Sequence, residues 1–529
     1  MAFDWQEGQY FQVFRIHTAS ELSGFFDSEF WTRSVLQESH SEASIRHAVV
    51  ALGALYKTLE KAAESPPGSP DNNYSGDTAP NHYNFALQQY GKALTRLRES
   101  LQSNESRSQR TVLISIVLFT CFQSFLGDHK AAIFQIQSGL GLLEERRQES
   151  KQPLIRPRNG VVEDELVQMF TRLAIQAKSY DMAFHFPPPF VIHLTPKQND
   201  PSSDPTSPQS PSSPSAASTA SMEDPNFPER FTSSREARSA LDSLCERIMR
   251  FNESLSAFYA GPNNILPSSI KSSGLGFRTQ LQQWASAFEP LLQSRRTPGV
   301  SNTERAGINV LKMIQIMTTV LFLMGFSTSE QEFDNFIAPF KEIVELAKEV
   351  VVDEELSLAQ ARCGDVSECR HRHKSTNAGL GMQFQGMASH GPAFGNRPDD
   401  SYLHIKPSFA LDLGIVPPLF VAATKCRDRR LRREAMRLLM SSPRREGMWD
   451  SILCGKVAAW IMEVEEEGMA PFDLFNPLSF AQVVGEDRRV MVKEILFDLQ
   501  KREATLRCGT RGARENDLDP RAKETHVSW

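Results

Sequence analysis

The stretch LGIVPPLFVAATKCRDRRLRREAMRLLMSSPRREGMWD, residues 413–450, decides how the chain folds. It begins with an apolar segment containing two adjacent prolines, continues into a strongly basic segment and ends in a Gly-Met-Trp turn. Within the basic segment, apolar residues recur at helical spacing at Leu431, Ala435, Leu438 and Leu439. This stripe predicts an amphipathic helix at 428–441 with one buried face and an arginine-rich polar face.

The arginine-rich face supports two interpretations. A cation cluster can bind phosphate or act as a nuclear-import signal. On a helix, however, a run of charges is more often a solvated or ion-paired face, and the acidic residues at 463–467 lie close enough in sequence to supply partners. The sequence therefore favours a packed helix and leaves a basic contact or nuclear-import patch as a hypothesis. That patch comprises Lys425, Arg427, Arg429, Arg430, Arg432 and Arg433.

Apolar residues recur at the helical period along nearly the whole chain, and alternating strand patterns are nearly absent. The fold class is therefore all-α with antiparallel helix packing. The most apolar run, residues 112–126, is shorter than a membrane span and is interrupted by polar residues, so we interpret it as a core helix and expect no membrane association. Further helices are expected near 45–59, 84–101, 130–145, 162–180, 232–259, 274–293, 303–326, 333–352, 408–426, 447–466 and 487–506.

Composition divides the chain. Residues 201–221 hold nine serines and five prolines, too few apolar side chains to offset the entropy of ordering. We expect helical parts at 1–194 and 229–506, a disordered Ser/Pro-rich linker at 195–228, a mobile loop at 363–401 and a polar tail at 507–529. The linker is either passive or a site of proline-directed phosphorylation. Its candidate phosphosites, each followed by proline, are Ser207, Ser210 and Ser213.

The catalytic and cofactor motifs of common enzymes are missing from the sequence. It has no phosphate-binding loop, H-E-x-x-H or G-x-S-x-G motif, and the S-x-x-K match at 268–271 lacks its companion motifs. One loop brings together two thiols and two imidazoles at Cys363, Cys369, His371 and His373, but the spacing differs from that of closed zinc sites. We therefore expect no catalytic, cofactor-binding or metal-binding residues. The net charge of −6 also argues against direct DNA binding.

Several blocks resemble, in order, the regulatory region of fungal transcription factors with a binuclear zinc cluster. They begin with YFQVFRIHTASELSGFFDSEFWTRSVLQESHSEASIRHAVVALGALYK at 10–57. NFALQQYGKALTRLRESL at 84–101 and VLISIVLFTCFQSFLGDHKAAIFQIQSGLGLLEE at 112–145 follow, and the last are the opening stretch and AAWIMEVEEEG at 458–468. The resemblance implies a large helical regulatory domain without the zinc cluster. It also implies a nuclear, non-enzymatic regulator of a metabolic or secondary-metabolite biosynthetic gene set.

The resemblance implies partners as well. They are the transcription machinery or other regulators, a second copy of the chain in a homodimer, and a small-molecule effector. The family's zinc cluster needs six cysteines in a short basic segment with C-x-x-C pairs, whereas this sequence has seven scattered cysteines and no C-x-x-C. Zinc is therefore expected only if an upstream six-cysteine segment is missing from the chain.

Two alternative functions stay open at this point. Residues 84–101 and 127–145 each look somewhat like a helix of a tetratricopeptide repeat, which would make the protein a peptide-binding scaffold. No third copy is visible at the expected period. The other alternative is an enzyme with an unfamiliar all-α site, which convergent titratable residues in a closed pocket would favour.

Overall fold

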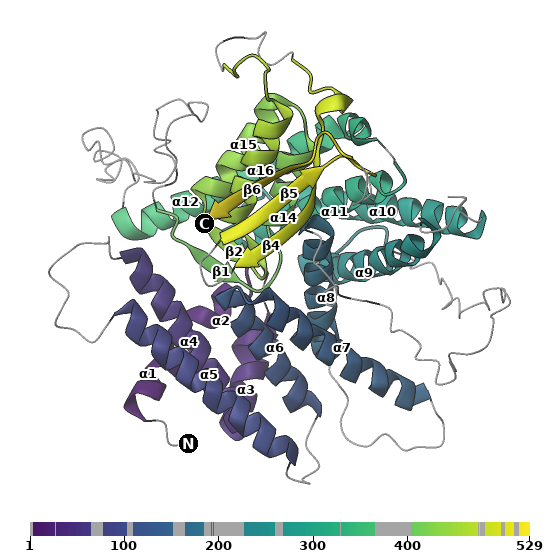
Figure 1. Ribbon diagram of the computed structural model, residues 1–529. Coiled ribbons are helices and arrows are strands. Elements are labelled where there is room, and N and C mark those ends of the chain that lie inside the picture. Colours follow the sequence, from purple (N-terminus) through teal and green to yellow (C-terminus); the bar gives the residue numbers. More distant parts are fainter. Residues whose placement is uncertain are drawn as a thin grey trace, which may run out of the picture.

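A computed structural model describes most of the chain (Figure 1). The described residues are 4–26, 28–64, 78–102, 109–151, 164–184, 192, 194, 227–259, 268–327, 329–364, 402, 404–473, 476, 482–498, 503–512 and 518–528. They form a mainly helical body with two small sheets, which confirms the all-α prediction. The expected linker at 195–228 lies outside the described residues except for its last two positions, and most of the expected loop at 363–401 also lies outside them.

The first part of the chain forms helices that pack as sequence neighbours. In particular, α4 packs against α5, α6 against α7 and α7 against α8. These elements are the purple to blue ribbons of Figure 1. Their bounds are α1 (Trp5–Val13), η1 (Phe14–Thr18), α2 (Ala19–Leu22), η2 (Phe30–Ser34), α3 (Val35–Ser41), α4 (Ala43–Glu64), α5 (Ala79–Gln102), α6 (Gln109–Leu126), α7 (His129–Lys151) and α8 (Asp164–Phe184).

The second part continues the helical body. The helices α9, α10 and α11 pack against one another. In addition, α8 packs against α9, the next helix in the sequence after the Ser/Pro-rich segment. The helix α12 contacts both α14 and α15. The bounds are α9 (Ser234–Tyr259), α10 (Ser268–Ser294), α11 (Asn302–Met324), η4 (Glu330–Phe336), α12 (Ile337–Cys363), α14 (Val416–Lys425), α15 (Arg429–Ser441), α16 (Ser451–Glu465) and η5 (Glu486–Arg488).

Two helices, α6 and α11, are long and apolar enough to cross a membrane by length and composition alone. In each helix, 67% of the apolar 18-residue stretch is buried inside the protein. Their apolar side chains belong to the same hydrophobic core as those of α4, α8 and α14. This burial confirms the interpretation of residues 112–126 as a core helix.

The centre of the fold is α14, whose residues from Val416 to Thr424 are all buried. Prolines at its first turn suit a helix start, because their missing N–H groups would have no helical partner there. The Glu446 carboxylate accepts hydrogen bonds from the backbone N–H groups of Gly414, Ile415 and Val416 at 2.8–3.0 Å. A carboxylate at this helix end satisfies unpaired donors and interacts favourably with the helix dipole. Both ends of the stretch 413–450 therefore meet at the start of α14.

The first small sheet joins α14 to the first part of the chain. It consists of β1 (Ser408–Ala410), β2 (Arg444–Glu446) and β3 (Trp449–Asp450), with β1 parallel to β2 and β2 antiparallel to β3. Two hydrogen bonds connect this region to the early helices. Gln176 Nε2 of α8 donates to the carbonyl of Leu411, just after β1, at 2.6 Å, and Arg445 of β2 donates to the Phe125 carbonyl of α6 at 2.7 Å.

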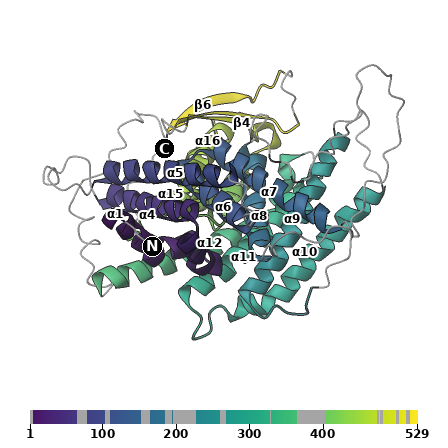
Figure 2. The ribbon, with the colours of Figure 1, turned by 90° about the horizontal axis from the view of Figure 1, so that it is seen from below.

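The second sheet corrects the sequence prediction for the end of the chain. The helix expected at 487–506 was wrong: β4 (Met491–Asp498), β5 (Glu503–Gly509) and β6 (Lys523–Ser528) form an antiparallel sheet that includes part of the expected polar tail. A register shift in β4 between Val492 and Glu494 places buried Val492 and Ile495 three residues apart, which imitates helical spacing. Figure 2 shows this sheet on the outside of the helical body.

An aromatic cluster fixes the second sheet to the helices. Phe497 of β4 lies near Tyr180 and Phe184 of α8, at centroid distances of 6.2 and 6.4 Å. Trp449 of β3 and Phe420 of α14 complete the cluster at 5.7 Å from each other. Aromatic contacts of this kind add to the burial of apolar area. The cluster therefore connects the early helices, the core helix and both sheets.

The close packing of Gly414 against Glu446 and Phe25 at the start of α14 predicts that adding a methyl group there will destabilise the protein. In Gly414→Ala, the new Cβ would lie 2.4 Å from Glu446 Oε1 and 2.6 Å from Phe25 Cε2. We expect the free energy of unfolding in urea to fall by about 1–3 kcal/mol, as in other overpacked cores. The control is Gly91→Ala in α5, where nothing lies within 4 Å and alanine should stabilise the helix slightly. Equal stability of Gly414→Ala and the wild type would contradict the proposed packing.

Candidate functional site

The basic segment lies at the centre of an ion-pair cluster. We call it the Arg–Glu cluster. It comprises Glu330, Lys425, Arg427, Arg429, Arg432, Arg433, Glu465, Glu466 and Arg511. Its members come from η4, the end of α14, the loop before α15, α15 itself, the end of α16 and the turn after β5. The cluster thus joins elements that are distant in sequence.

The most buried carboxylate of the cluster is that of Glu465, with a side-chain exposure of 0%. Arg427 Nη2 lies 2.8 Å from its Oε1 atom, and Arg432 Nη1 lies 2.9 Å from its Oε2 atom. The backbone N–H of Val490, just before β4, also donates to Glu465 Oε1 at 3.1 Å. Burial raises the pKa of Glu465, but the charges of Arg427 and Arg432 outweigh this effect and lower it.

The second buried carboxylate is that of Glu330 in η4. It lies 3.1 Å from Lys425 Nζ, 2.9 Å from Arg427 Nη2 and 2.9 Å from Arg511 Nη1. Burial raises the pKa of Glu330, but the charges of these three cations outweigh it and lower the pKa to about 2. Arg427 bridges Glu330 and Glu465, so η4 and α16 share one guanidinium group.

The third carboxylate, Glu466, pairs with the outer side of α15. Arg433 donates to both of its oxygens, at 2.6 and 3.0 Å, and Arg429 Nη2 lies 2.8 Å from Oε2. The Arg433 guanidinium also lies 4.2 Å from the centre of the Phe472 ring, a favourable cation–π arrangement. The forked guanidinium suits such paired contacts better than a lysine ammonium would.

The structure thus places the hypothesised basic patch mainly inside the protein. Arg427, Arg429 and Arg432 are buried, Lys425 and Arg433 are half-buried with carboxylate partners, and Arg430 is exposed. The ion-pair interpretation of Glu465 and Glu466 is therefore confirmed. A contact or nuclear-import role for these six residues stays a prediction. The candidate phosphosites Ser207, Ser210 and Ser213 lie outside the described residues.

Two members of the cluster were not predicted from the sequence. Glu330 is 95 residues from its partner Lys425, and Arg511 is 181 residues from its partner Glu330. Neither residue stands out by local pattern, because each has similar charged residues close by in the sequence. Long-range pairs of this kind have no periodicity, so a single sequence carries no signal for them.

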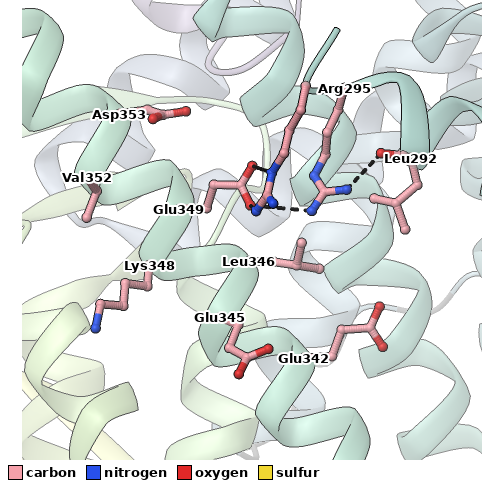
Figure 3. A pocket seen from close by; sticks show the side chains of 10 residues that line it. Leu292, Arg295, Glu342, Glu345, Leu346, Lys348, Glu349, Val352 and Asp353 are labelled. Atoms are coloured by element: carbon pink, nitrogen blue, oxygen red, sulfur yellow. Dashed lines mark hydrogen bonds and ion pairs between the residues drawn. The ribbon is translucent and has the colours of Figure 1, made fainter.

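A pocket of about 480 Å³ opens between the end of α10 and one face of α12 (Figure 3). Its aliphatic wall comes from Leu292, Leu346 and Val352. The remaining lining is charged: Arg295, Arg296, Glu342, Glu345, Lys348, Glu349 and Asp353. The acidic positions follow helical spacing on α12, a pattern that is visible in the sequence.

The pocket carries internal ion pairs. Arg296 Nη2 lies 2.7 Å from Glu349 Oε2, and Arg295 Nη2 lies 3.4 Å from the same oxygen. Burial raises the pKa of Glu349, but its hydrogen bond to Arg296 and the charge of Arg295 lower it overall. The volume suits a small molecule, but the charged lining differs from the mainly apolar pockets that most ligands occupy. Only a polar ligand able to compete with these pairs would suit it.

Among the described residues, no group of three or more His, Cys, Asp or Glu side chains is arranged to hold a metal ion. Of the four residues that the sequence brings together at 363–373, only Cys363 is described. Its neighbour is His404, with Cys363 Sγ 3.4 Å from His404 Nε2. Cys369, His371 and His373 lie outside the described residues.

Comparison with known proteins gives the family context. Residues 9–158, which span α1 to α7, match the fungal specific transcription factor domain. This part of the chain is therefore similar to the fungal specific transcription factor domain. This match confirms the resemblance noted in residues 10–57, 84–101 and 112–145. The Arg–Glu cluster and the charged pocket both lie outside the matched residues.

Two relatives add to the comparison. The aspercryptin biosynthesis cluster-specific transcription regulator atnN of Emericella nidulans is 23% identical over 493 residues, covering 86% of this chain and 73% of the relative. The transcription regulator lscL of Purpureocillium lilacinum is 28% identical over 115 residues, covering 22% of this chain and 26% of the relative. No solved structure matches the chain.

The Arg–Glu cluster predicts that two neighbouring arginines of α15 differ sharply in importance. Arg432→Met leaves Glu465 and Glu466 with fewer cations, and we expect it to lower the free energy of unfolding by about 3 kcal/mol. Arg430→Met makes the same change on the exposed face of the helix and should leave stability unchanged within error. Urea unfolding followed by circular dichroism measures both variants. Equal effects would show that the buried pairs do not stabilise the fold.

The lowered pKa of Glu330 predicts a dependence of stability on pH. Its pKa is about 2 in the folded protein against an ordinary 4.5, so its contribution is complete above about pH 4.5 and is lost as the pH falls towards 2. The difference between these pKa values corresponds to about 3 kcal/mol at neutral pH. Glu330→Gln should therefore be less stable at pH 7 and should lose less stability than the wild type as the pH falls from about 5 to about 2. Parallel pH profiles in urea unfolding would contradict this role.

Proposed function

We propose that the protein is a transcription regulator of a biosynthetic gene set and that it acts through contacts with other proteins. The observation that carries the proposal is the match of residues 9–158 to the fungal specific transcription factor domain. The relative that aligns with 86% of the chain is described as a cluster-specific regulator of aspercryptin biosynthesis, which supports a biosynthetic gene set as the target. The proposed role is non-enzymatic and nuclear.

The electrostatics of the chain support protein contacts over direct phosphate recognition. Most cations of the basic segment pair with Glu330, Glu465 and Glu466. A cation held by a buried carboxylate cannot also neutralise a phosphate without leaving that carboxylate unpaired. The net charge of −6 also disfavours direct binding to phosphate. The proposed partners are therefore components of the transcription machinery or other regulators.

A homodimer is part of this proposal, and α5 offers a surface for it. Leu87, Leu94 and Leu101 follow one another at intervals of seven residues and are 38%, 39% and 60% exposed. A spacing of seven supplies one of the two apolar positions per heptad of a helix-pair seam, so these leucines offer exposed apolar surface for contact with a second copy. Sedimentation velocity would measure the association, and a monomer at all concentrations would contradict it. A small-molecule effector stays a prediction from the family resemblance.

A tethering experiment tests the proposed function. The complete chain is fused to a heterologous DNA-binding domain in a fungal host, with a reporter gene under the matching binding sites. We expect reporter transcription to change relative to the DNA-binding domain alone, because the chain recruits its partners to the promoter. The fusion of the Arg432→Met variant should have a weaker effect in proportion to its lost stability. Unchanged transcription with a well-expressed nuclear fusion would contradict the proposal.

A further inference from the structure

The end of α12 places a thiol beside a buried histidine. Cys363 is the last residue of the helix, and the chain turns away at Gly364, whose φ of +72° favours glycine. Cys363 is half-buried, and its Sγ atom lies 3.4 Å from Nε2 of His404. The two residues are 41 positions apart, so the fold rather than local sequence creates the pair.

The imidazole of His404 is held in one orientation. Its Nδ1 atom lies 2.6 Å from Glu355 Oε1, and the backbone N–H groups of His404 and Ile405 donate to Glu355 Oε2 at 2.9 and 3.2 Å. The His404 carbonyl accepts a hydrogen bond from Arg362 Nη1 at 2.8 Å. His404 is 3% exposed and Glu355 is 8% exposed. Little freedom is left for the ring to rotate.

The hydrogen bonds also assign the tautomer. A carboxylate only accepts hydrogen bonds, so Nδ1 of His404 must carry the proton that it shares with Glu355. In the neutral ring, Nε2 then has its lone pair directed at the Cys363 thiol. A nucleophile, a base and a carboxylate that orients the base are the parts of an activated thiol.

The other described cysteines have different surroundings. Cys121, Cys245, Cys426, Cys454 and Cys508 are all buried, with at most 3% exposure. Burial raises the pKa of Cys245 to about 12 and the pKa values of Cys426 and Cys508 to about 11. Thiols with these properties react slowly, because the thiolate is the reactive form. Among the described cysteines, Cys363 alone combines partial exposure with a base.

We propose that Cys363 is a nucleophilic modification site for small electrophiles, with His404 as its base and Glu355 as the positioning residue for that base. The thiol proton passes to His404 Nε2, and the sulfur forms a bond to the electrophilic atom while that atom loses its leaving group. With a hydroperoxide, an S–O bond forms and the O–O bond breaks. The leaving oxygen then takes the proton from His404, and the sulfur is oxidised to a sulfenic acid. The modification is stoichiometric and goes beyond the proposed regulatory function.

Iodoacetamide alkylation of the full-length protein tests this site. Peptide mass spectrometry follows the rate at each cysteine at neutral pH, in the native protein and in urea. Unassisted free thiols are only a few per cent ionised at this pH, so activation should raise the rate at Cys363 about tenfold. We expect Cys363 to react faster in the native protein than in urea, and the buried cysteines to react more slowly in the native protein. A rate at Cys363 that is equal or lower in the native protein would overturn the proposal.

Variants separate the roles of the two partners. His404→Asn should slow native alkylation at Cys363 about tenfold by removing the base. Glu355→Gln should slow it by a smaller factor, because the base remains but its tautomer is no longer enforced. Circular dichroism checks that both variants fold. An unchanged rate at Cys363 in folded His404→Asn would contradict the assignment. If this variant does not fold, the comparison of native protein with urea decides the question.

Discussion

Glu465 has no exposed side-chain surface and lies between the guanidinium groups of Arg427 and Arg432. Removing a carboxylate from water costs several kcal/mol, and only close, well-placed cations offset this cost. The surrounding elements must therefore hold their positions together. Arg427 also pairs with Glu330 of η4, and Arg511 connects the end of β5 to the same carboxylate. Displacing one of these elements would leave a charge buried without a partner.

This requirement explains how a long chain with distant segments forms one body. The stretch 413–450 supplies the buried helix α14, the Glu446 carboxylate at its start and the cations of α15. The aromatic cluster around Trp449 and Phe420 supplies apolar contact to α8 and β4. Apolar packing provides the larger stabilisation, and separating the buried ion pairs would cost free energy. Residues 9–158, which are similar to the fungal specific transcription factor domain, contact the second part of the chain through the hydrogen bond from Arg445 to the Phe125 carbonyl.

Sequence reasoning was strongest where periodicity is long and regular. Helices such as α6, α9 and α11 were predicted within a few residues, and Glu465 and Glu466 were identified as partners for α15. It failed for β4, because the register shift places Val492 and Ile495 at helical spacing. The alternation of buried Ala504, Leu506 and Cys508 in β5 was present but short. Glu330 and His404 could not be found, since their partners are far away in sequence and no local pattern indicates them.

The central claim is that the arginines of α15 are internal partners of buried carboxylates and hold the fold together. A double-mutant cycle between Arg432 and Glu465 measures this interaction directly, using Arg432→Met, Glu465→Leu and the double variant in urea unfolding. Each single change leaves a buried charge short of its partner, whereas the double change removes both charges of that pair. The structure predicts a coupling free energy of about 2 kcal/mol or more, with the double variant more stable than the sum of the single effects indicates. Additive effects would contradict the claim.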